Sequence, residues 1–193
     1  MATTPLKRRL RAESIAAILG MSEADRAARG ARILDEVRGL ASYRGAGTVL
    51  LYLKAFPEEI ETGPLLADAL AAGRRVACPR VVGRAAGMVL HEVRDLGDLR
   101  AGTLGIPEPV PDAPIVAPED LDWVLAPGVA FDPACNRLGR GAGHYDRLLP
   151  RVRPGIEVWA AAFDVQMLDM LPVEPHDVPL TGVVTESRIL RRA

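Results

Sequence analysis

Short apolar runs alternate with amphipathic stretches along most of this chain. Continuous apolar runs are typical of strands buried on both faces, and they predict strands at residues 48–53, 75–79, 88–93, 122–126, 157–163 and 183–185. Helical spacing of apolar residues predicts helices over residues 5–19, from Ser22 to the turn at 45–47, and over 65–72, 144–152 and 165–171. Strands that alternate with helices indicate an α/β fold with a mainly parallel sheet.

Three segments between these elements have the composition of loops. Residues 57–62 are acidic and follow the first predicted strand, residues 96–104 form a connection, and residues 107–118 contain five prolines, typical of an extended surface loop. Ligands of parallel sheets bind beyond the carboxyl ends of the strands. We therefore expect the acidic loop and the segment after 122–126 to share one crevice, within a single domain spanning residues 1–193.

Composition and charge narrow the class of protein. Of the 193 residues 49% are hydrophobic, as in an ordinary globular protein, and the net charge of −1 provides no field to recruit nucleic acid or an acidic membrane. Cys78 and Cys135 lack CxxC spacing, which favours a reducing compartment. We find no signal-peptide pattern and no apolar run long enough for a membrane span. We expect a cytoplasmic protein, a monomer or weak homodimer, without nucleic-acid or membrane partners.

Candidate chemistry gathers in the glycine-rich segment from residue 137 to residue 146. Three glycines stand at alternate positions: Gly139, Gly141 and Gly143. Glycines permit positive φ and let successive N–H groups point at one anion, and the helix that follows adds its first amides. Arg137 and Arg140 carry forked donors suited to phosphate, and Asp146 offers oxygen ligands to a divalent cation. The alternative is a flexible turn with solvated arginines, but this combination between a strand and a helix favours a phosphate site.

These residues belong to a longer pattern, PGVAFDPACNRLGRGAGHYDR, at residues 127–147. It resembles the hallmark of the 5-formyltetrahydrofolate cyclo-ligases, also called methenyltetrahydrofolate synthetases. Five further segments match the same family in order: KRRLR at 7–11, EIET at 59–62, CPRV at 78–81, GIPEP at 105–109 and PVEPHD at 172–177. Six ordered matches are far more specific than any one of them alone.

The resemblance implies a fold, a reaction and co-substrates. The expected fold is a three-layer αβα arrangement of the sugar-phosphate-isomerase/CoA-transferase-like (Rossmann-like) type. The implied reaction uses ATP and Mg²⁺: the formyl oxygen of 5-formyltetrahydrofolate is phosphorylated, N10 attacks the activated carbon, and phosphate leaves to give 5,10-methenyltetrahydrofolate. Phosphoryl transfer needs mainly alignment and charge stabilisation, which arginines and loop amides supply.

The resemblance also implies a set of site residues. Those expected at ATP are Lys7, Arg8, Arg9, Leu10, Arg11, Arg137, Leu138, Gly139, Arg140, Gly141, Ala142, Gly143, His144 and Tyr145. Those expected at the folate substrate are Arg11, Leu53, Glu59, Arg140, Gly141, Ala142, Gly143 and His144. Arg140, Lys7 and Arg137 would act in catalysis, and Asp146 would bind the metal.

Three positions depart from the family pattern. His144 replaces a tyrosine, Cys135 stands where a glycine is frequent, and Thr181 stands where an aspartate often follows the HD pair. These departures put in doubt a stacking or hydroxyl contact, the shape of the turn and a second metal ligand, respectively. None of them removes the phosphate cradle.

Other readings of the same residues stay open. Lys7 and Arg11 lie one helical turn apart and on their own predict a solvated face, and Glu58, Glu59 and Glu61 are equally compatible with a solubilising loop. A His-Asp pair such as 176–177 is more often structural than catalytic. As for function, the alternatives are another phosphate-binding enzyme on the same scaffold, or a non-catalytic folate- or RNA-binding relative.

Overall fold

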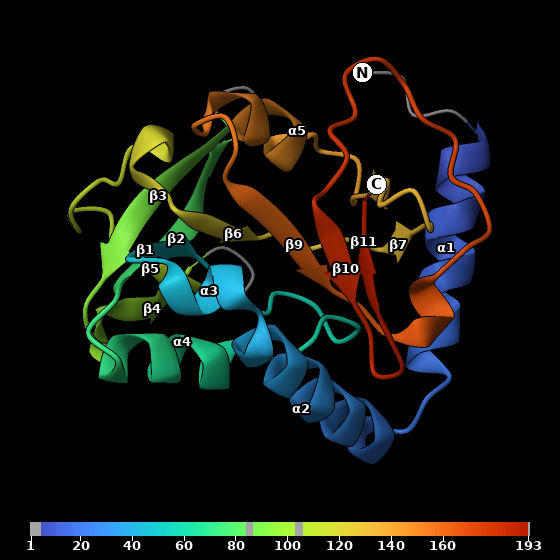
Figure 1. Ribbon diagram of the computed structural model, residues 1–193, viewed down its shortest axis with the longest axis horizontal. Coiled ribbons are helices and arrows are strands. Elements are labelled where there is room, and N and C mark those ends of the chain that lie inside the picture. Colours follow the sequence, from blue (N-terminus) through green and yellow to red (C-terminus); the bar gives the residue numbers. More distant parts are fainter. Residues whose placement is uncertain (1–4, 84–86, 103–105, 193) are drawn as a thin grey trace.

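The computed structural model describes residues 5–83, 87–102 and 106–192 (Figure 1). Its helices are α1 (Pro5–Leu19), α2 (Glu23–Gly39), α3 (Ala41–Gly45), α4 (Gly63–Ala71) and α5 (His144–Leu148), with 3-10 turns η1 (Leu96–Asp98), η3 (Pro118–Asp120), η4 (Leu149–Arg151) and η5 (Asp164–Gln166). Its strands are β1 (Thr48–Leu50), β2 (Arg75–Gly83), β3 (Gly87–Val93), β4 (Leu99–Ala101), β5 (Pro107–Pro109), β6 (Trp123–Leu125), β7 (Ala130–Phe131), β8 (Arg137–Leu138), β9 (Glu157–Ala161), β10 (Gly182–Val184) and β11 (Ile189–Arg191).

A seven-stranded sheet in the order β11-β10-β9-β6-β1-β2-β3 organises the described chain. The strands from β10 to β2 pair in parallel, while β11 and β3 pair antiparallel at the two edges. Two short hairpins, β4–β5 and β7–β8, lie outside this sheet. The mainly parallel sheet predicted from the apolar runs is therefore confirmed.

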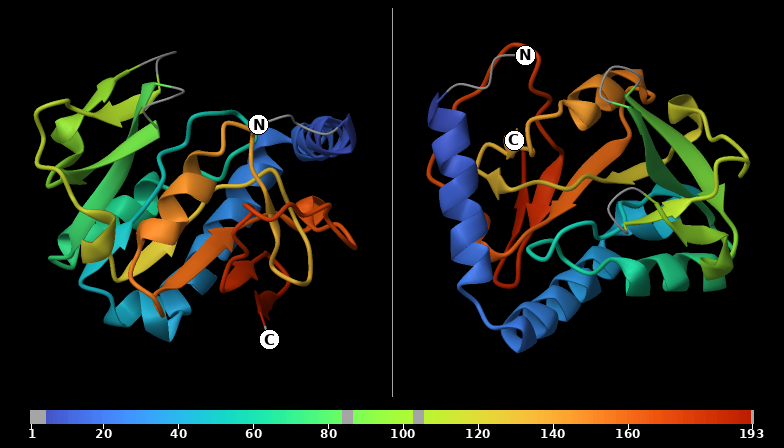
Figure 2. Two further views of the ribbon diagram at one scale, coloured as in Figure 1. Left: turned by 90° about the horizontal axis from the view of Figure 1, so that it is seen from above. Right: turned by 180° about the vertical axis from the view of Figure 1, so that it is seen from behind.

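Alternate residues of the central strands enter two different cores. Val49 packs with residues of α2, α3 and α4 on one face of the sheet, whereas Leu50 packs with residues of α5 and η4 on the other. This is the three-layer arrangement expected of strands that are apolar on both faces. Helix α1 stands at the β10–β11 end, opposite β3 (Figures 1 and 2). None of the helices in the described ranges is long and apolar enough to cross a bilayer.

Several predicted elements are shorter than expected, because tertiary contacts and proline override local pattern. The strand at 48–53 ends at Leu50, although Leu51 N still donates to the β2 carbonyl of Ala77 at 3.0 Å. The helix predicted over 144–152 stops at Leu148 and continues as the 3-10 turn η4, whose second residue is a proline without an N–H donor. The single helix after Ser22 is broken at the extended residue Leu40 into α2 and α3.

The helix predicted over 165–171 is wrong. Only the 3-10 turn η5 forms, and the residues after it bond to the β7 region: Leu168 N donates to Phe131 O at 2.8 Å, and Leu171 N donates to Asp132 Oδ2 at 3.0 Å. These N–H groups donate to residues far away in sequence, so they form no hydrogen bonds within a helix. Strand β11 and the β7–β8 hairpin were not predicted from the sequence.

The proline-rich segment 107–118 is only partly the exposed loop predicted. Its first residues form β5, which pairs with β4 inside the predicted connection 96–104. Glu108 and Val116 are buried, so this segment packs against the body of the protein. Residues 103 and 104 of that connection, and Gly105 of the family-like segment 105–109, lie outside the described residues.

Candidate active site

A pocket of about 500 Å³ opens beyond the carboxyl ends of the parallel strands. Its walls come from α1, the loop after β1, the loop after β6, the glycine-rich segment, the segment that carries Glu174, His176 and Asp177, and parts of β2, β3 and β5. The acidic loop 57–62 and the glycine-rich segment thus contribute to one pocket, as the sequence predicted.

The glycine-rich segment bends sharply along the pocket wall. Gly141 and Gly143 have φ of 100° and 67°, a region that disfavours side chains. A Cβ on Gly139 would lie 2.6 Å from Nη1 of Arg137, so a side chain at this position would displace that guanidinium. The helix that follows, α5, has only five residues, so its dipole is smaller than the sequence predicted.

Arg137 and Asp146 form an ion pair in which the arginine is buried and the aspartate is partly exposed. Arg137 Nη2 lies 2.7 Å from Oδ1 of Asp146, and its side chain is 4% exposed against 15% for Asp146. Arg137 Nη1 also donates to the carbonyl of Pro127 at 3.2 Å. Both side chains line the pocket, and their pairing ties the hairpin strand β8 to helix α5.

Arg140 lies across the pocket against the acidic loop. Its Nη2 forms an ion pair with Oε1 of Glu58, and its Cζ lies 3.3 Å from the centre of the Phe56 ring. Burial lowers the pKa of Arg140 from its ordinary value. The side chain of Arg140 thus joins the glycine-rich segment to the loop after β1.

Lys7 is held between two carboxylates that come from the far end of the chain. Its Nζ lies 2.7 Å from Glu174 Oε2 and 2.6 Å from Asp177 Oδ2, and only 6% of its side chain is exposed. Burial disfavours the charge of Lys7, but the hydrogen bonds to Asp177 and Glu174 outweigh it, and the pKa of Lys7 is raised. We call these three residues the lysine clamp. The solvated-face reading of Lys7 is therefore wrong.

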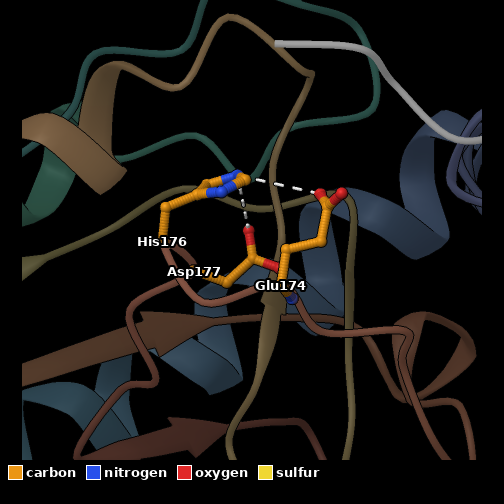
Figure 3. A group of neighbouring side chains, drawn as sticks. All are labelled: Glu174, His176 and Asp177. Atoms are coloured by element: carbon orange, nitrogen blue, oxygen red, sulfur yellow. Dashed lines mark hydrogen bonds and ion pairs between the residues drawn. The ribbon is translucent and has the colours of Figure 1, made fainter.

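His176 completes a cluster with the two acids of the lysine clamp. Its Nε2 lies 3.7 Å from Glu174 Oε2 and 3.6 Å from Asp177 Oδ1 (Figure 3). One ligand atom of each of the three residues lies within 4.8 Å of the others, which is close enough for metal coordination. The ammonium of Lys7 contacts both carboxylates and offsets one of their two negative charges.

The lysine clamp has a defined pH range. Burial opposes the ionised Asp177, but hydrogen bonds from Lys7 and from the backbone N–H of Glu174 prevail and lower its pKa below 3.8. The clamp therefore adds stability that is present above pH 3.8 and is lost as the pH falls through the lower folded-state pKa. The raised pKa of Lys7 keeps the clamp intact up to at least pH 10.5.

We expect Asp177→Asn to lower the free energy of unfolding by a constant amount between about pH 5 and pH 9. The difference from the unsubstituted protein should shrink below about pH 4, as Asp177 is protonated. Urea unfolding at a series of pH values measures it. A difference that stays constant down to pH 2 would show that Asp177 has no depressed pKa.

Two further predicted residues lie in the pocket with backbone partners. Arg11 Nε donates to the carbonyl of Gly139 at 2.6 Å, which attaches α1 to the glycine-rich segment. Glu59 Oε2 accepts from the backbone N–H of Ala55 at 2.7 Å and of Phe56 at 3.3 Å, so it shapes its own loop. Burial raises the pKa of Glu59 above its ordinary value.

The other predicted residues divide between the pocket and its surroundings. Those that line it are Leu53, Leu138, Gly139, Gly141, Ala142, Gly143, His144 and Tyr145. Arg8 and Arg9 are exposed on α1 and are absent from the pocket wall, while Leu10 packs against Ala130, Leu138 and Leu171. The hydroxyl of Tyr145 is buried, and it has no hydrogen-bond partner among the described residues.

The three departures from the family pattern have separate consequences. Cys135 keeps a glycine-like φ of 59°, so the turn is accommodated by a strained, buried cysteine. His144 lines the pocket, and burial together with Arg147 lowers its pKa, which favours the neutral ring. Thr181 accepts a hydrogen bond from Val158 N at 2.9 Å between β9 and the start of β10, away from the pocket wall.

Sequence reasoning missed Glu58 and Glu174 as pocket residues. Both are acids whose partners lie more than 80 residues away in sequence, so no local spacing identifies them. The buried indoles of Trp123 and Trp159 belong to the core and are absent from the pocket wall, and Cys78 is likewise a core residue.

Comparison with known proteins places these features in a family. The sequence profile described as the 5-formyltetrahydrofolate cyclo-ligase family matches residues 3–186. A 5-formyltetrahydrofolate cyclo-ligase of Mycolicibacterium smegmatis is 40% identical over 64% of this chain and 66% of its own length. One of Escherichia coli K12 is 37% identical over 75% and 80%, respectively. The solved structure of Aquifex aeolicus 5,10-methenyltetrahydrofolate synthetase is 32% identical, covers 96% of this chain and 92% of that chain, and superposes with a TM-score of 0.84.

Proposed function

We propose that this chain, which belongs to the 5-formyltetrahydrofolate cyclo-ligase family, converts 5-formyltetrahydrofolate into 5,10-methenyltetrahydrofolate at the expense of ATP. The observation that carries the proposal is one pocket that brings four basic side chains and a glycine-rich loop opposite the acidic loop after β1. Such a pocket offers donors to phosphate on one wall and acceptors to a pterin on the other.

The proposed chemistry follows from the poor reactivity of a formyl amide. Its oxygen is a poor leaving group, and transfer of the γ-phosphoryl group from ATP to this oxygen releases ADP and creates a good one. N10 then attacks the formyl carbon, its proton is released, and the C–O bond to phosphate breaks to leave the methenyl bridge. The enzyme has to align the two substrates and stabilise the charge of the transferred group.

Within this scheme the basic residues have distinct parts. Arg140 and the amides of residues 139–143 meet the transferred phosphoryl group, and Arg11 holds this loop in place through Gly139. Lys7 and Arg137 also contribute positive charge to the pocket, and each is anchored on a carboxylate. Glu59 faces the folate and accepts N–H groups of its pterin ring.

The residues present fit a magnesium ion. Asp146 lines the pocket, is partly exposed and has one oxygen on Arg137, and no hydrogen bond is recorded for its other oxygen within the described ranges. Mg²⁺ prefers such carboxylate oxygens together with phosphate oxygens. We therefore assign the metal to Asp146, where it would neutralise charge on the phosphates of ATP. We also place the protein in the cytoplasm as a monomer or weak homodimer.

We expect the purified protein to form methenyltetrahydrofolate from 5-formyltetrahydrofolate only when Mg-ATP is present. The near-ultraviolet absorbance of the product follows the reaction, and parallel samples without ATP or with EDTA are the controls. Absence of ATP-dependent product at high enzyme concentration would overturn the proposed function. ATP turnover on a different substrate would instead favour another phosphate-binding enzyme, and folate binding without turnover would favour a non-catalytic relative.

A further inference from the structure

Glu58 is a buried acid in the pocket wall that the proposed reaction does not use. It is 6% exposed, whereas Glu61 in the same loop is exposed and accepts a hydrogen bond from the N–H of Gly63. A buried carboxylate without a cation is costly, and the cation here is Arg140. The pairing joins two loops that are 82 positions apart in sequence, from residue 58 to residue 140.

Phe56 adds a second constraint on the same guanidinium. Cζ of Arg140 lies 3.3 Å from the centre of the Phe56 ring, as in a cation–π contact. Arg140 stands between Gly139 and Gly141, where the backbone itself restrains a side chain very little. The guanidinium is therefore contacted through Nη2 by the carboxylate of Glu58 and through Cζ by the ring of Phe56.

These two contacts leave part of the guanidinium fork for a ligand. Within residues 5–83, 87–102 and 106–192, the side chain of Arg140 makes one polar contact, the ion pair to Glu58. The side chain is 36% exposed. Arg140 lines the pocket, so its remaining N–H groups are within reach of a bound anion. A guanidinium can bridge a carboxylate and a phosphate because its donors point in different directions.

We propose that Glu58 and Phe56 are positioning residues that fix the guanidinium plane of Arg140 toward the transferred phosphoryl group. The inference rests on the proposed function, since it takes an anionic phosphoryl group as the ligand of Arg140. Glu58 and Phe56 themselves touch neither substrate in this proposal. They set the direction of the charge that Arg140 supplies.

Glu58→Gln tests the first contact, because it keeps the shape of the side chain and removes its charge. We expect kcat to fall by about 10- to 100-fold, the effect of misplacing one group at a reacting centre, with a smaller change in KM for ATP. Glu58→Asp should retain more activity than Glu58→Gln. Glu61→Gln, which removes a charge from the exposed part of the same loop, is the matched control and should leave both constants unchanged.

Phe56→Leu and Phe56→Tyr test the second contact. Leucine keeps an apolar side chain without an aromatic face, and kcat should fall in the same direction as with Glu58→Gln. Tyrosine keeps the face and should retain most of the activity. Equal kcat values for Phe56→Leu, Phe56→Tyr and the unsubstituted protein would overturn the role of Phe56.

A double-mutant cycle with Arg140→Ala separates positioning from a general structural effect. If Glu58 acts through Arg140, Glu58→Gln causes no further loss of kcat once Arg140 is absent. Glu58→Gln should also raise the melting temperature of the Arg140→Ala protein, because it removes the buried charge of Glu58, which has lost its partner. An equal loss of kcat with and without Arg140 would overturn the proposal.

Calorimetric titration with ATP provides a readout that does not depend on turnover. The effects of Glu58→Gln and Arg140→Ala on ATP affinity should be non-additive. If the unsubstituted protein binds ATP but makes no methenyl product, the proposed function fails. The binding measurements on the two single variants and the double variant would still show whether Glu58 and Arg140 are coupled. Additive effects on both affinity and melting temperature would reject the positioning role even if the folate reaction is found.

Discussion

Arg137→Ala is expected to reduce ATP-dependent turnover by at least about 1000-fold and to lower the free energy of unfolding by about 3–5 kcal/mol. The substitution leaves Asp146, which is 15% exposed, without the cation that lies 2.7 Å from its oxygen. It also removes the donor to the carbonyl of Pro127. The hairpin β7–β8 and helix α5 lose their shared anchor, and the loop between them loses its shape.

Urea unfolding and the absorbance assay measure the two effects separately. Arg151→Ala, an exposed arginine just after α5, is the control and should change neither quantity. Asp146→Asn introduced into the Arg137→Ala protein should recover part of the lost stability and none of the activity. A stable Arg137→Ala protein with normal turnover would show that the ion pair has no part in the site.

Lys7→Met is expected to reduce turnover by at least about 100-fold. It removes the ammonium from the lysine clamp and leaves the carboxylates of Glu174 and Asp177 facing each other. Loss of stability should be about 2 kcal/mol, less than for a fully buried pair, because Glu174 is 33% and Asp177 18% exposed. Turnover falls for two reasons: the pocket loses a positive charge, and the segment that carries Glu174 and Asp177 is no longer held against α1.

The pH dependence of stability shows whether Lys7→Met acts by breaking the ion pairs of the lysine clamp or only by removing the packing of a side chain. The stability deficit of Lys7→Met should be largest near neutral pH and should shrink below about pH 4, where both carboxylates take up protons. Lys7→Arg should keep much of the stability. Arg32→Met on the exposed face of α2 is the matched control and should behave like the unsubstituted protein. A deficit independent of pH would contradict the role of the two acids.

The central sheet was predictable because its information is local. Val49 and Leu50 are both apolar and enter different cores, so a continuous apolar run indicates a strand between two layers. The helix predicted at 165–171 failed for the opposite reason. Its amides bond to Phe131 and Asp132, some forty residues earlier in the chain, and no local pattern reports this.

The same distinction applies to the candidate site. The glycine-rich segment could be found from its spacing, since the positive φ of Gly141 and Gly143 favours glycine at those positions. The separate roles of the three glutamates in the acidic loop could not be predicted from the sequence. Glu58, Glu59 and Glu61 are chemically alike, and only the folded chain assigns the first to Arg140, the second to backbone amides and the third to an exposed turn.

The lysine clamp also bears on when the pocket can form during synthesis. Lys7 and Asp177 are 170 positions apart, so the contact closes a loop that includes most of the chain. Contacts of such separation are entropically costly to form early and slow the folding of the parts that depend on them. Helix α1 is made first and must wait for the segment around Asp177 before this wall exists. A nascent chain arrested before residue 174 should therefore hold much of its sheet and lack a complete pocket.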